Sequence, residues 1–337
     1  MTRMIDRLDV SRRPMVDSFG RRITYVRLSV TDRCDLRCRY CMAERMTFMP
    51  RRDLLSYEEM LALAHVLIER GVRRIRLTGG EPLVRRDVMW LIDRLGARIG
   101  SGLDELTLTT NGTQLAHHAR ALFDAGVRRI NVSLDSLDPE RFAYITRRGD
   151  LGQVLGGIQT AAEAGLAIKI NMMALAGVNE DEFGAMLAWC GARGFDLTLI
   201  ETMPLGEVED HRPERYLALD TVLAHLQEGW TLTASMHRTS GPARYYDVGE
   251  SGIRLGLITP MSHNFCAGCN RIRIAATGTV YGCLGHDQKV ELRDILRDGG
   301  PVAVAAALDR LLGGKPERHQ FDLSRPASTR HMSVTGG

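Results

Sequence analysis

The segment that decides the fold is Cys34-Asp-Leu-Arg-Cys38-Arg-Tyr-Cys41, which places three cysteines in a C-x3-C-x2-C spacing. It directly follows residues 23–30, Ile-Thr-Tyr-Val-Arg-Leu-Ser-Val, whose composition predicts a strand. Thiolates are soft ligands, and this spacing lets one loop direct three sulfurs at a single centre. A zinc site with three cysteines usually takes a nearby histidine, but the nearest downstream histidine, His65, falls within a predicted helix. We therefore predict an iron–sulfur cluster in which one iron is open to a ligand that is not protein.

The triad, with Tyr40 before its last cysteine, resembles the motif of the radical S-adenosylmethionine superfamily. The resemblance implies that Cys34, Cys38 and Cys41 bind a [4Fe–4S] cluster whose fourth iron binds S-adenosylmethionine. Downstream, Gly79-Gly80-Glu81-Pro82 is similar to the superfamily's glycine-rich segment that binds the methionyl amine. Taken alone, this tetrapeptide would be an ordinary strand-to-helix turn.

Length and composition limit the class of protein. A chain of 337 residues with 44% hydrophobic and 25% charged residues is typical of one large or two ordinary globular domains. The net charge of +3 is too small to indicate nucleic-acid or membrane binding. Residues 1–14 lack the apolar core of a signal peptide, and no apolar run reaches membrane-spanning length. Seven cysteines in such a chain favour metal or redox chemistry over disulfides, and we expect a cytoplasmic protein.

From Ile23 to about Met203, β-rich runs alternate with helical stretches. The predicted strands are Ile23–Val30, Arg73–Thr78, Glu105–Thr110, Val127–Leu134, Leu166–Met173 and Phe195–Thr202. The predicted helices are Ser56–Arg70, Asp87–Ile99, Gln114–Ala125, Gly152–Ala164 and Glu180–Ala192. Glu59 completes a capping box at the start of the first helix, and Gly71 ends it. This alternation predicts a parallel sheet that closes into a barrel or partial barrel.

The predicted strands are not uniformly apolar, as strands buried on both faces should be. With a period of two, one face carries apolar side chains and the other carries polar ones. The polar set is Arg27, Ser29, Thr31, Arg74, Arg76, Thr78, Thr107, Thr109, Asn111, Asn131, Ser133, Asp135, Lys169, Asn171 and, less clearly, Glu201 and Met203. Because the apolar face must contact the helices, the polar face must line the interior, where unpaired polar groups are costly. We therefore expect the interior to bind a large polar ligand.

An antiparallel sheet with one solvated face is the alternative, and the intervening helices argue against it.

Past Met203 the pattern changes to a helix at Tyr216–Glu228 and then to β-rich pieces. These are Trp230–Met236, Arg244–Val248, Ile253–Ile258 and Arg271–Ala275. They surround a second group of three cysteines, Cys266, Cys269 and Cys283. On spacing alone this group could be a structural zinc site completed by His263 or His286. Cys190 is predicted to be a small buried helix residue, and the polar segment from Lys315 to the terminal Gly336-Gly337 is predicted to be mobile.

The second triad distinguishes families within the superfamily. Phe265-Cys-Ala-Gly-Cys-Asn-Arg-Ile-Arg273, Cys283 and the terminal Gly-Gly resemble the GTP 3′,8-cyclase family, which opens molybdenum-cofactor biosynthesis. Other motifs extend the resemblance over nearly the whole chain, and they are Arg27, Gly79–Pro82, Thr110–Gly112, Val132–Asp135, Lys169–Asn171, Gly177–Asn179 and Glu201–Pro204.

The resemblance implies an α/β fold, an incomplete (β/α)6 TIM-like barrel with a C-terminal α+β domain that holds a second cluster. The implied division is an N-terminal extension (1–22), the radical S-adenosylmethionine partial barrel (23–204), the auxiliary-cluster domain (205–315) and a tail ending in Gly-Gly (316–337). It also implies conversion of GTP to 3′,8-cyclo-7,8-dihydro-GTP. A 5′-deoxyadenosyl radical would remove the ribose 3′ hydrogen, and the resulting carbon radical would attack guanine C8. The implied cofactors are two [4Fe–4S] clusters and S-adenosylmethionine.

The same resemblance assigns roles to individual residues. Cys266, Cys269 and Cys283 are expected to bind the second cluster, whose open iron binds the guanine. The residues expected to bind S-adenosylmethionine are Tyr40, Gly79, Gly80, Glu81, Thr109, Ser133, Lys169 and Met203. Those expected to bind GTP are Arg27, Arg74, Arg76, Arg271 and Arg273, of which Arg27, Arg271 and Arg273 are the expected catalytic arginines. A guanidinium suits phosphate oxygens, although the commoner place for an arginine is the solvated surface.

One position departs from the family pattern, since Thr198 stands where the family usually has arginine.

The implied partners are an accessory cyclic pyranopterin monophosphate synthase that acts on the product, an electron donor and a second copy of the chain in a homodimer. Another radical enzyme with an auxiliary cluster would share the first triad but would usually carry a longer, more cysteine-rich C-terminus. A non-enzymatic iron–sulfur carrier would need the thiolates but not the polar strand faces.

Overall fold

The computed structural model describes residues 13–206, 208, 212–328 and 330–336. Residues 1–12 of the predicted N-terminal extension, which are most of the segment without signal-peptide features, lie outside the described residues. The last residue of the Gly-Gly end also lies outside them. Within the described residues, no helix is both long enough and apolar enough to span a membrane.

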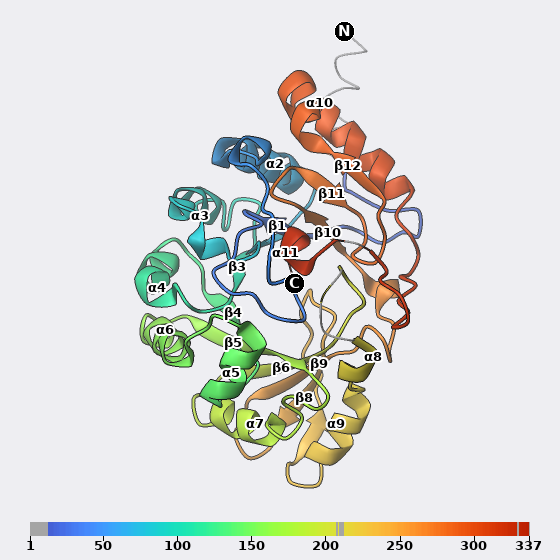
Figure 1. The fold of residues 1–337 in the computed structure, drawn as a ribbon. Coiled ribbons are helices and arrows are strands. Elements are labelled where there is room, and N and C mark those ends of the chain that lie inside the picture. The colour runs from blue at the N-terminus through green and yellow to red at the C-terminus, as the bar shows by residue number, and fades with distance from the viewer. Residues whose placement is uncertain (1–12, 207, 209–211, 329, 337) are drawn as a thin grey trace.

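Six parallel strands form the centre of the fold and confirm the predicted alternation of strands and helices. They are β1 (Tyr25–Ser29), β2 (Arg74–Thr78), β3 (Glu105–Thr110), β4 (Arg129–Ser133), β5 (Ala167–Ala174) and β6 (Asp196–Glu201). Each strand pairs in parallel with its sequence neighbour, and all six lie within two residues of their predicted ends. Figure 1 shows the strands curving around a central space with helices outside them.

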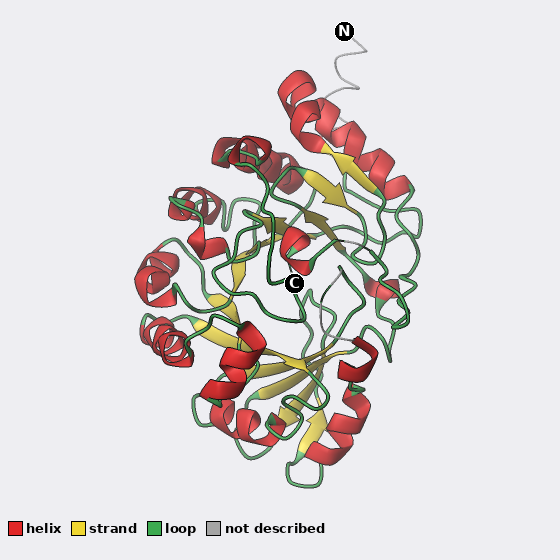
Figure 2. Cartoon of the chain, viewed as in Figure 1, coloured by secondary structure: helices red, strands yellow, loops and turns green. Residues whose placement is uncertain are grey.

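The connecting helices cover the outer face of this curved sheet (Figure 2). They are α2 (Tyr57–Glu69), α3 (Val88–Gly96), α4 (Leu115–Asp124), α5 (Pro139–Thr146), α6 (Leu151–Glu163) and α7 (Phe183–Gly191). The predicted capping box of α2 is present, because Ser56 Oγ accepts from Glu59 N and a Glu59 carboxylate oxygen accepts from Ser56 N. Helix α5 was not predicted, although Asp138 caps it and Pro139 starts it.

The strands after residue 204 extend both edges of the same sheet. Strand β10 (Arg271–Ile274) pairs in parallel with β1, and β9 (Arg254–Ile258) pairs in parallel with β6. Antiparallel strands follow on each side, namely β11 (Thr279–Tyr281), β12 (Lys289–Glu291), β8 (Arg244–Val248) and β7 (Leu232–Ala234). Within the described residues these make one twelve-stranded sheet, with β12 and β7 at its two ends. The C-terminal region is therefore continuous with the partial barrel.

Further helices accompany the later strands: α8 (Arg212–Arg215), α9 (Leu219–Leu226) and α10 (Leu292–Gly313). Helix α10 was not predicted, because it contains Gly299-Gly300-Pro301, and Gly300 departs from helical geometry at a kink. Helix α10 lies beside α2 (Figure 1). The buried Arg70 guanidinium joins them through the Ala305 carbonyl oxygen and the Asp309 carboxylate.

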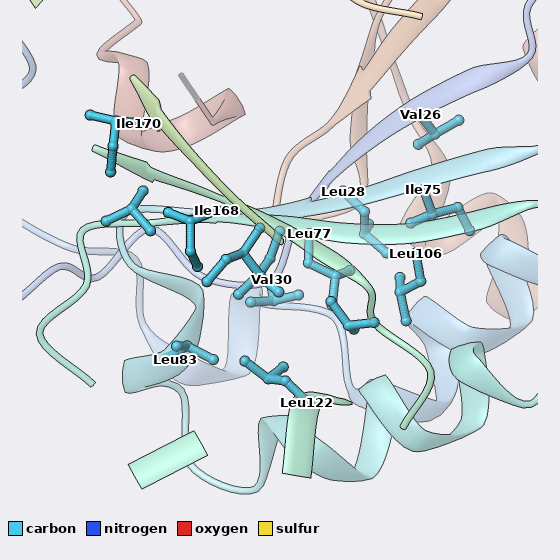
Figure 3. Close-up of a cluster of buried hydrophobic side chains, with 14 of the residues drawn as sticks. Val26, Leu28, Val30, Ile75, Leu77, Leu83, Leu106, Leu122, Ile168 and Ile170 are labelled. Atoms are coloured by element: carbon cyan, nitrogen blue, oxygen red, sulfur yellow. The ribbon is translucent and has the colours of Figure 1, made fainter. Parts of the chain in front are cut away.

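The alternation of strand faces is confirmed by the core. The apolar positions of the strands, among them Val26, Leu28, Ile75 and Leu106, lie in one buried cluster with side chains from the helices (Figure 3). The polar positions pair with one another across the sheet, for example Arg27 with Arg76 and Asn131 with Lys169. Burying apolar surface on one face therefore directs the polar side chains to the inside.

Glu201 is an exception to this prediction. Because Asn171 pairs with Thr198, Thr198 belongs to the polar face and Glu201 belongs to the outer face. The buried Glu201 carboxylate accepts hydrogen bonds there from the backbone N–H groups of Leu219, Met261 and Ser262. It links β6 to the start of α9 and does not face the interior.

The expectation of a mobile tail is wrong for the part of it that the structure describes. Residues Met332–Thr335 form a short helix, α11, that lies against β1 in the centre of the ring of strands (Figure 1). Met332, Ser333 and Thr335 are buried. Glu317, Arg318 and Arg325 earlier in the tail are exposed, so the polar composition predicted exposure correctly there and failed for the end that enters the interior.

Candidate active site

The first cysteine motif lies in the loop after β1, and the glycines after β2 hold that loop in place. Gly80 N donates to the Thr31 carbonyl oxygen at 2.9 Å, and Glu81 N donates to the Arg33 carbonyl oxygen at 2.8 Å. A Cβ on Gly79 would lie 2.5 Å from the Thr31 carbonyl oxygen, and one on Gly80 would clash with Arg33. The two glycines are required because the two backbones approach so closely.

The loop is also bound to the end of β3. The Asp35 carboxylate accepts hydrogen bonds from Asn111 Nδ2 at 2.7 Å and from Thr113 Oγ1 at 2.6 Å. Within the loop, Arg37 Nη1 donates to the Cys34 carbonyl oxygen at 2.5 Å and to the Leu36 carbonyl oxygen at 2.7 Å. These bonds fix the backbone from which the three thiols project.

Glu81 does not line the cavity, but its hydrogen bonds hold the glycine-rich turn in place. Its buried carboxylate accepts from Leu83 N, Thr110 Oγ1 and Asn111 N at 3.0, 2.9 and 2.6 Å. Burial raises the pKa of Glu81 to about 8 despite these donors. The carboxylate therefore joins the glycine-rich turn to β3.

Tyr40 faces the cavity and is held by Asp135 at the end of β4. The Tyr40 hydroxyl donates to Asp135 Oδ2 at 2.7 Å, and Met173 N donates to Asp135 Oδ1 at 2.8 Å. Burial raises the pKa of Asp135 to about 6. Asn179 completes the arrangement, since its Nδ2 donates to the Asp135 and Met173 carbonyl oxygens at 2.8 and 2.9 Å. The ends of β4 and β5 thus position the aromatic ring beside the cysteines.

The second cysteine group approaches the same cavity from the loops around β10 and β11. Cys266 begins a short 3-10 turn, Cys266–Gly268, and Cys269 follows it just before β10, while Cys283 follows β11. The Cys266 carbonyl oxygen accepts from Arg21 Nη1 at 2.8 Å. None of the described cysteines forms a disulfide.

All six cysteines of the two motifs line one cavity. The empty space between its walls, including the part open to solvent, is about 1560 Å³. Cys34, Cys38 and Cys41 reach it from the loop after β1, and Cys266, Cys269 and Cys283 reach it from the loops around β10 and β11. Among the described residues, no three His, Cys, Asp or Glu side chains are arranged to hold a single metal ion.

The expected arginine ligands divide into two groups. Arg27, Arg271 and Arg273 line the cavity and are at most 9% exposed. Burial lowers the pKa of Arg27 to about 10, with further lowering from Arg76 and Arg271. Arg27 Nε is buried without a hydrogen-bond partner. Such concentrated positive charge, with a free donor, is suited to an anionic ligand.

Arg74 and Arg76 share the polar face with Arg27 but do not line the cavity. Arg74 Nη1 donates to Ser240 Oγ at 2.5 Å, and its Nε lies 3.7 Å from the Glu105 carboxylate. The Arg76 guanidinium lies over the Tyr25 ring at 5.7 Å from its centroid, and its Nε is buried without a partner. Arg74 begins β2, at the end of the strand away from the cysteine loops, whereas Arg76 is in register with Arg27 at the middle of the strand.

Most residues expected to bind S-adenosylmethionine do line the cavity, namely Tyr40, Gly79, Gly80, Thr109, Ser133 and Met203. Lys169 does not. It is buried, and its Nζ donates to the Tyr245 hydroxyl at 2.7 Å. Thr198 has a buried hydroxyl without a hydrogen-bond partner. Gly256 lies between this hydroxyl and the Tyr245 ring, because a Cβ on Gly256 would be 3.0 Å from Thr198 Oγ1 and 3.1 Å from the ring. Lys169 and Thr198 therefore belong with Arg74 at the amino-terminal side of the interior.

Some cavity residues were missed from the sequence. Met332 and Ser333 of α11 line the cavity, as do Phe265, His319 and Phe321. The Arg273 guanidinium donates to the Gly336 carbonyl oxygen at 2.7 Å. The His319 ring stacks on Phe321 at 4.0 Å between centroids, and its Nε2 is buried without a partner. The placement of the tail brings His319, Met332 and Ser333 to the cavity, and no local pattern marks them. Phe265, in contrast, directly precedes the second cysteine motif.

Comparisons with known proteins place this chain. Residues 28–190 match the Radical SAM superfamily, and residues 195–321 match the Molybdenum Cofactor Synthesis C family. A crystal structure of Streptococcus suis SuiB is similar in fold, with a TM-score of 0.61 and 14% identity over 91% of this chain and 70% of that one. Its S-adenosylmethionine-bound structure is also similar, with a TM-score of 0.58 and 15% identity over 99% of this chain and 80% of that one.

Two curated relatives are similar over nearly their whole length. A GTP 3′,8-cyclase of Erythrobacter litoralis is 57% identical over 96% of this chain and 98% of its own. A GTP 3′,8-cyclase of Rhizobium etli is 54% identical over 98% of this chain and 96% of its own. The superfamily match implies a [4Fe–4S] cluster and S-adenosylmethionine as cofactors. The chain belongs to the GTP 3′,8-cyclase family.

Proposed function

We propose that this chain converts GTP into 3′,8-cyclo-7,8-dihydro-GTP, the first step of molybdenum-cofactor biosynthesis. The observation that carries the proposal is one cavity lined by two groups of three cysteines and by three buried arginines. Two groups of thiolates provide for two clusters, and the arginines provide for a triphosphate. Family membership supports the same conclusion.

The first cluster would be held by Cys34, Cys38 and Cys41. Burial raises the pKa of Cys38 well above its usual value and that of Cys41 to about 12. Buried thiols of this kind become thiolates readily only when a metal centre compensates their charge. When bound, this cluster supplies the electron that cleaves S-adenosylmethionine into methionine and a 5′-deoxyadenosyl radical.

The chain's own residues would orient S-adenosylmethionine beside that cluster. Gly79 and Gly80 line the cavity beside the cysteine loop, so their backbone would contact the methionyl group, and Tyr40 is fixed by Asp135. Thr109 Oγ1 is buried at the cavity wall without a hydrogen-bond partner. An unpaired buried hydroxyl at this place is suited to a polar ligand. Ser133 and Met203 complete the wall, while Glu81 supports it.

The second cluster would be held by Cys266, Cys269 and Cys283. Burial raises the pKa of Cys269, but the positive charges of Arg271 and Lys315 more than offset burial and lower the pKa to about 7. A thiolate is therefore favoured at this position. The open coordination position would face the guanine, and the aromatic rings of Phe265 and Phe321 would flank it.

GTP would extend from this second group toward the amino-terminal side of the barrel. Arg27, Arg271 and Arg273 would bind it within the cavity, and Arg74 and Arg76 would reach the phosphates beyond. Lys169 would bind the phosphates as well, because its Nζ is held by the Tyr245 hydroxyl at the amino-terminal side of the interior. It would supply the positive charge that the family's usual arginine at position 198 supplies, since Gly256 separates Thr198 from Tyr245.

Three partners belong to the proposal. An electron donor would reduce the clusters, and an accessory cyclic pyranopterin monophosphate synthase would consume the product. A second copy of the chain would form a homodimer.

The test is turnover by the reconstituted protein with a strong reductant, S-adenosylmethionine and GTP. We expect 5′-deoxyadenosine and the cyclised product in equal amounts, followed by chromatography and mass spectrometry. Cys34→Ser should abolish 5′-deoxyadenosine formation, because the first cluster loses a ligand. A carrier would make no 5′-deoxyadenosine. A different radical enzyme would make 5′-deoxyadenosine without consuming GTP, and either result would refute the proposal.

A further inference from the structure

Lys315 is buried beside the second cysteine group. The side chain is 3% exposed, and its Nζ lies 3.6 Å from Cys269 Sγ. Within the described residues this sulfur is the only hydrogen-bond partner of the Nζ, and no carboxylate pairs with it. Buried charges are costly unless they are paired. A buried ammonium whose partner is a single sulfur therefore requires an explanation.

The residue type is informative in this chain. Of 44 cationic residues, only Lys169, Lys289 and Lys315 are lysine, and the remainder are arginine. Lys289 is exposed and pairs with Glu291 at 3.1 Å, whereas Lys169 is buried against a phenol. A lysine is a compact charge on a flexible stem, while an arginine presents a wide planar fork. At position 315 the compact ammonium reaches the Cys269 sulfur, and the Lys315 stem packs against Gly282.

The backbone that carries Lys315 is fastened to the cysteine motif. Arg21 Nη1 donates to the carbonyl oxygens of Cys266 at 2.8 Å and Glu317 at 2.6 Å, and its Nη2 donates to that of Pro316 at 2.7 Å. Asp17 holds the same guanidinium through Nε at 2.6 Å. A buried ion pair thus locks the segment after Lys315 onto the turn that carries Cys266. Lys315 is positioned by a dedicated support and is not placed there by a flexible tail.

We propose that the Lys315 ammonium donates a hydrogen bond to the Cys269 thiolate when that thiolate binds the second cluster, and thereby raises the cluster's reduction potential. The inference rests on the second cluster of the proposed function. Hydrogen bonds to sulfur ligands and nearby positive charge stabilise the reduced cluster, which carries more negative charge. Burial strengthens the effect, because the interaction is poorly screened. Lys315 is a positioning residue that acts through Cys269 and does not touch the reacting atoms.

The test compares Lys315→Met, which removes charge and donor, with Lys315→Gln, which keeps a neutral donor. The matched control is Lys289→Met, which removes an exposed ammonium. Iron content is measured first, and reduction of each cluster is then followed by electron paramagnetic resonance during a potentiometric titration. At a fixed applied potential we expect the ratio of reduced to oxidised second cluster to fall about tenfold in Lys315→Met, which equals about 59 mV for a one-electron couple. Lys315→Gln should fall between that variant and the parent.

The first cluster should titrate as in the parent in every variant, and Lys289→Met should be unchanged throughout. An unchanged second-cluster potential in an iron-replete Lys315→Met protein would overturn the proposal. If Lys315→Met loses the second cluster, Lys315→Gln decides, and a parental potential in that variant overturns the proposal equally. If the parent itself holds only about four irons, the second cluster of the proposed function fails, and this inference fails with it. The iron content separates that failure from a failure of Lys315 alone.

Discussion

The guanidinium of Arg273 donates a hydrogen bond to the carbonyl oxygen of Gly336 at 2.7 Å, across 63 residues of chain. Arg27 Nη1 lies 3.5 Å from the same oxygen. The end of the chain therefore contacts two of the arginines proposed to bind GTP. GTP bound by these arginines would lie beside Gly336 and would share their donors with it.

This contact makes Gly336→Ala informative. Gly336 has φ +72, and a Cβ there would clash with Thr78, so alanine should displace the end of the chain from the cavity. We expect product formation to fall about a hundredfold, the usual cost of ~1 Å of misplacement at a reacting centre. Turnover with GTP and S-adenosylmethionine measures it. The control is Gly252→Ala, which has φ +68 but open space. Equal losses in the two variants would remove the special role of Gly336.

Arg27→Ala should weaken GTP binding. Loss of a charged hydrogen bond costs about 1.5–3 kcal/mol, or on the order of ten- to a hundredfold in affinity. Calorimetric titration with GTP measures it. The exposed Arg22 is the matched control, and Arg22→Ala should bind GTP as the parent does. Parental affinity in Arg27→Ala would show that the inward-facing guanidinium is not used for GTP.

Cys283→Ser separates a second cluster from a structural zinc site. We expect about eight irons in the parent and about four in the variant, from two and one four-iron clusters. The first cluster should remain, so the variant should still cleave S-adenosylmethionine while forming no cyclised product. Metal analysis and product assays measure both. Four irons and one zinc in the parent would establish the zinc alternative.

Thr198→Val tests the departure from the family pattern. Thr198 Oγ1 is buried without a partner, so replacing the hydroxyl by a methyl should stabilise the protein by about 1 kcal/mol. The matched control is Thr107→Val, which is in register with Arg76 on the polar face and whose hydroxyl donates to the Arg129 carbonyl oxygen at 2.7 Å. That change should destabilise the protein by a similar amount. Chemical unfolding without GTP measures both, and a destabilised Thr198→Val would mean that its hydroxyl has a partner after all.

The alternation of strand and helix patterns, together with the residues that begin and end helices, was sufficient to predict the partial barrel. Strand β3 was predicted at its observed bounds, and the capping box of α2 is present. By contrast, α10 escaped prediction, because Gly299-Gly300-Pro301 is a local signal for a break. The backbone does break at Gly300, which is not helical, and two helical segments join there at a kink beside α2. The break signal was therefore correct locally, but it did not predict the helical turns on its two sides.

The sequence by itself determined the fold class and the candidate cluster ligands, because the alternation of strand faces and the cysteine spacing are properties of short segments. Only the tertiary structure decided which residues share the cavity. It turned Glu201 to the outer face, because register across β5 assigns Thr198 to the inside. It brought Lys315 to Cys269 and Gly336 to Arg273. Contacts between segments so far apart depend on how the whole sheet curves and where the tail finds room, and no local pattern carries that information.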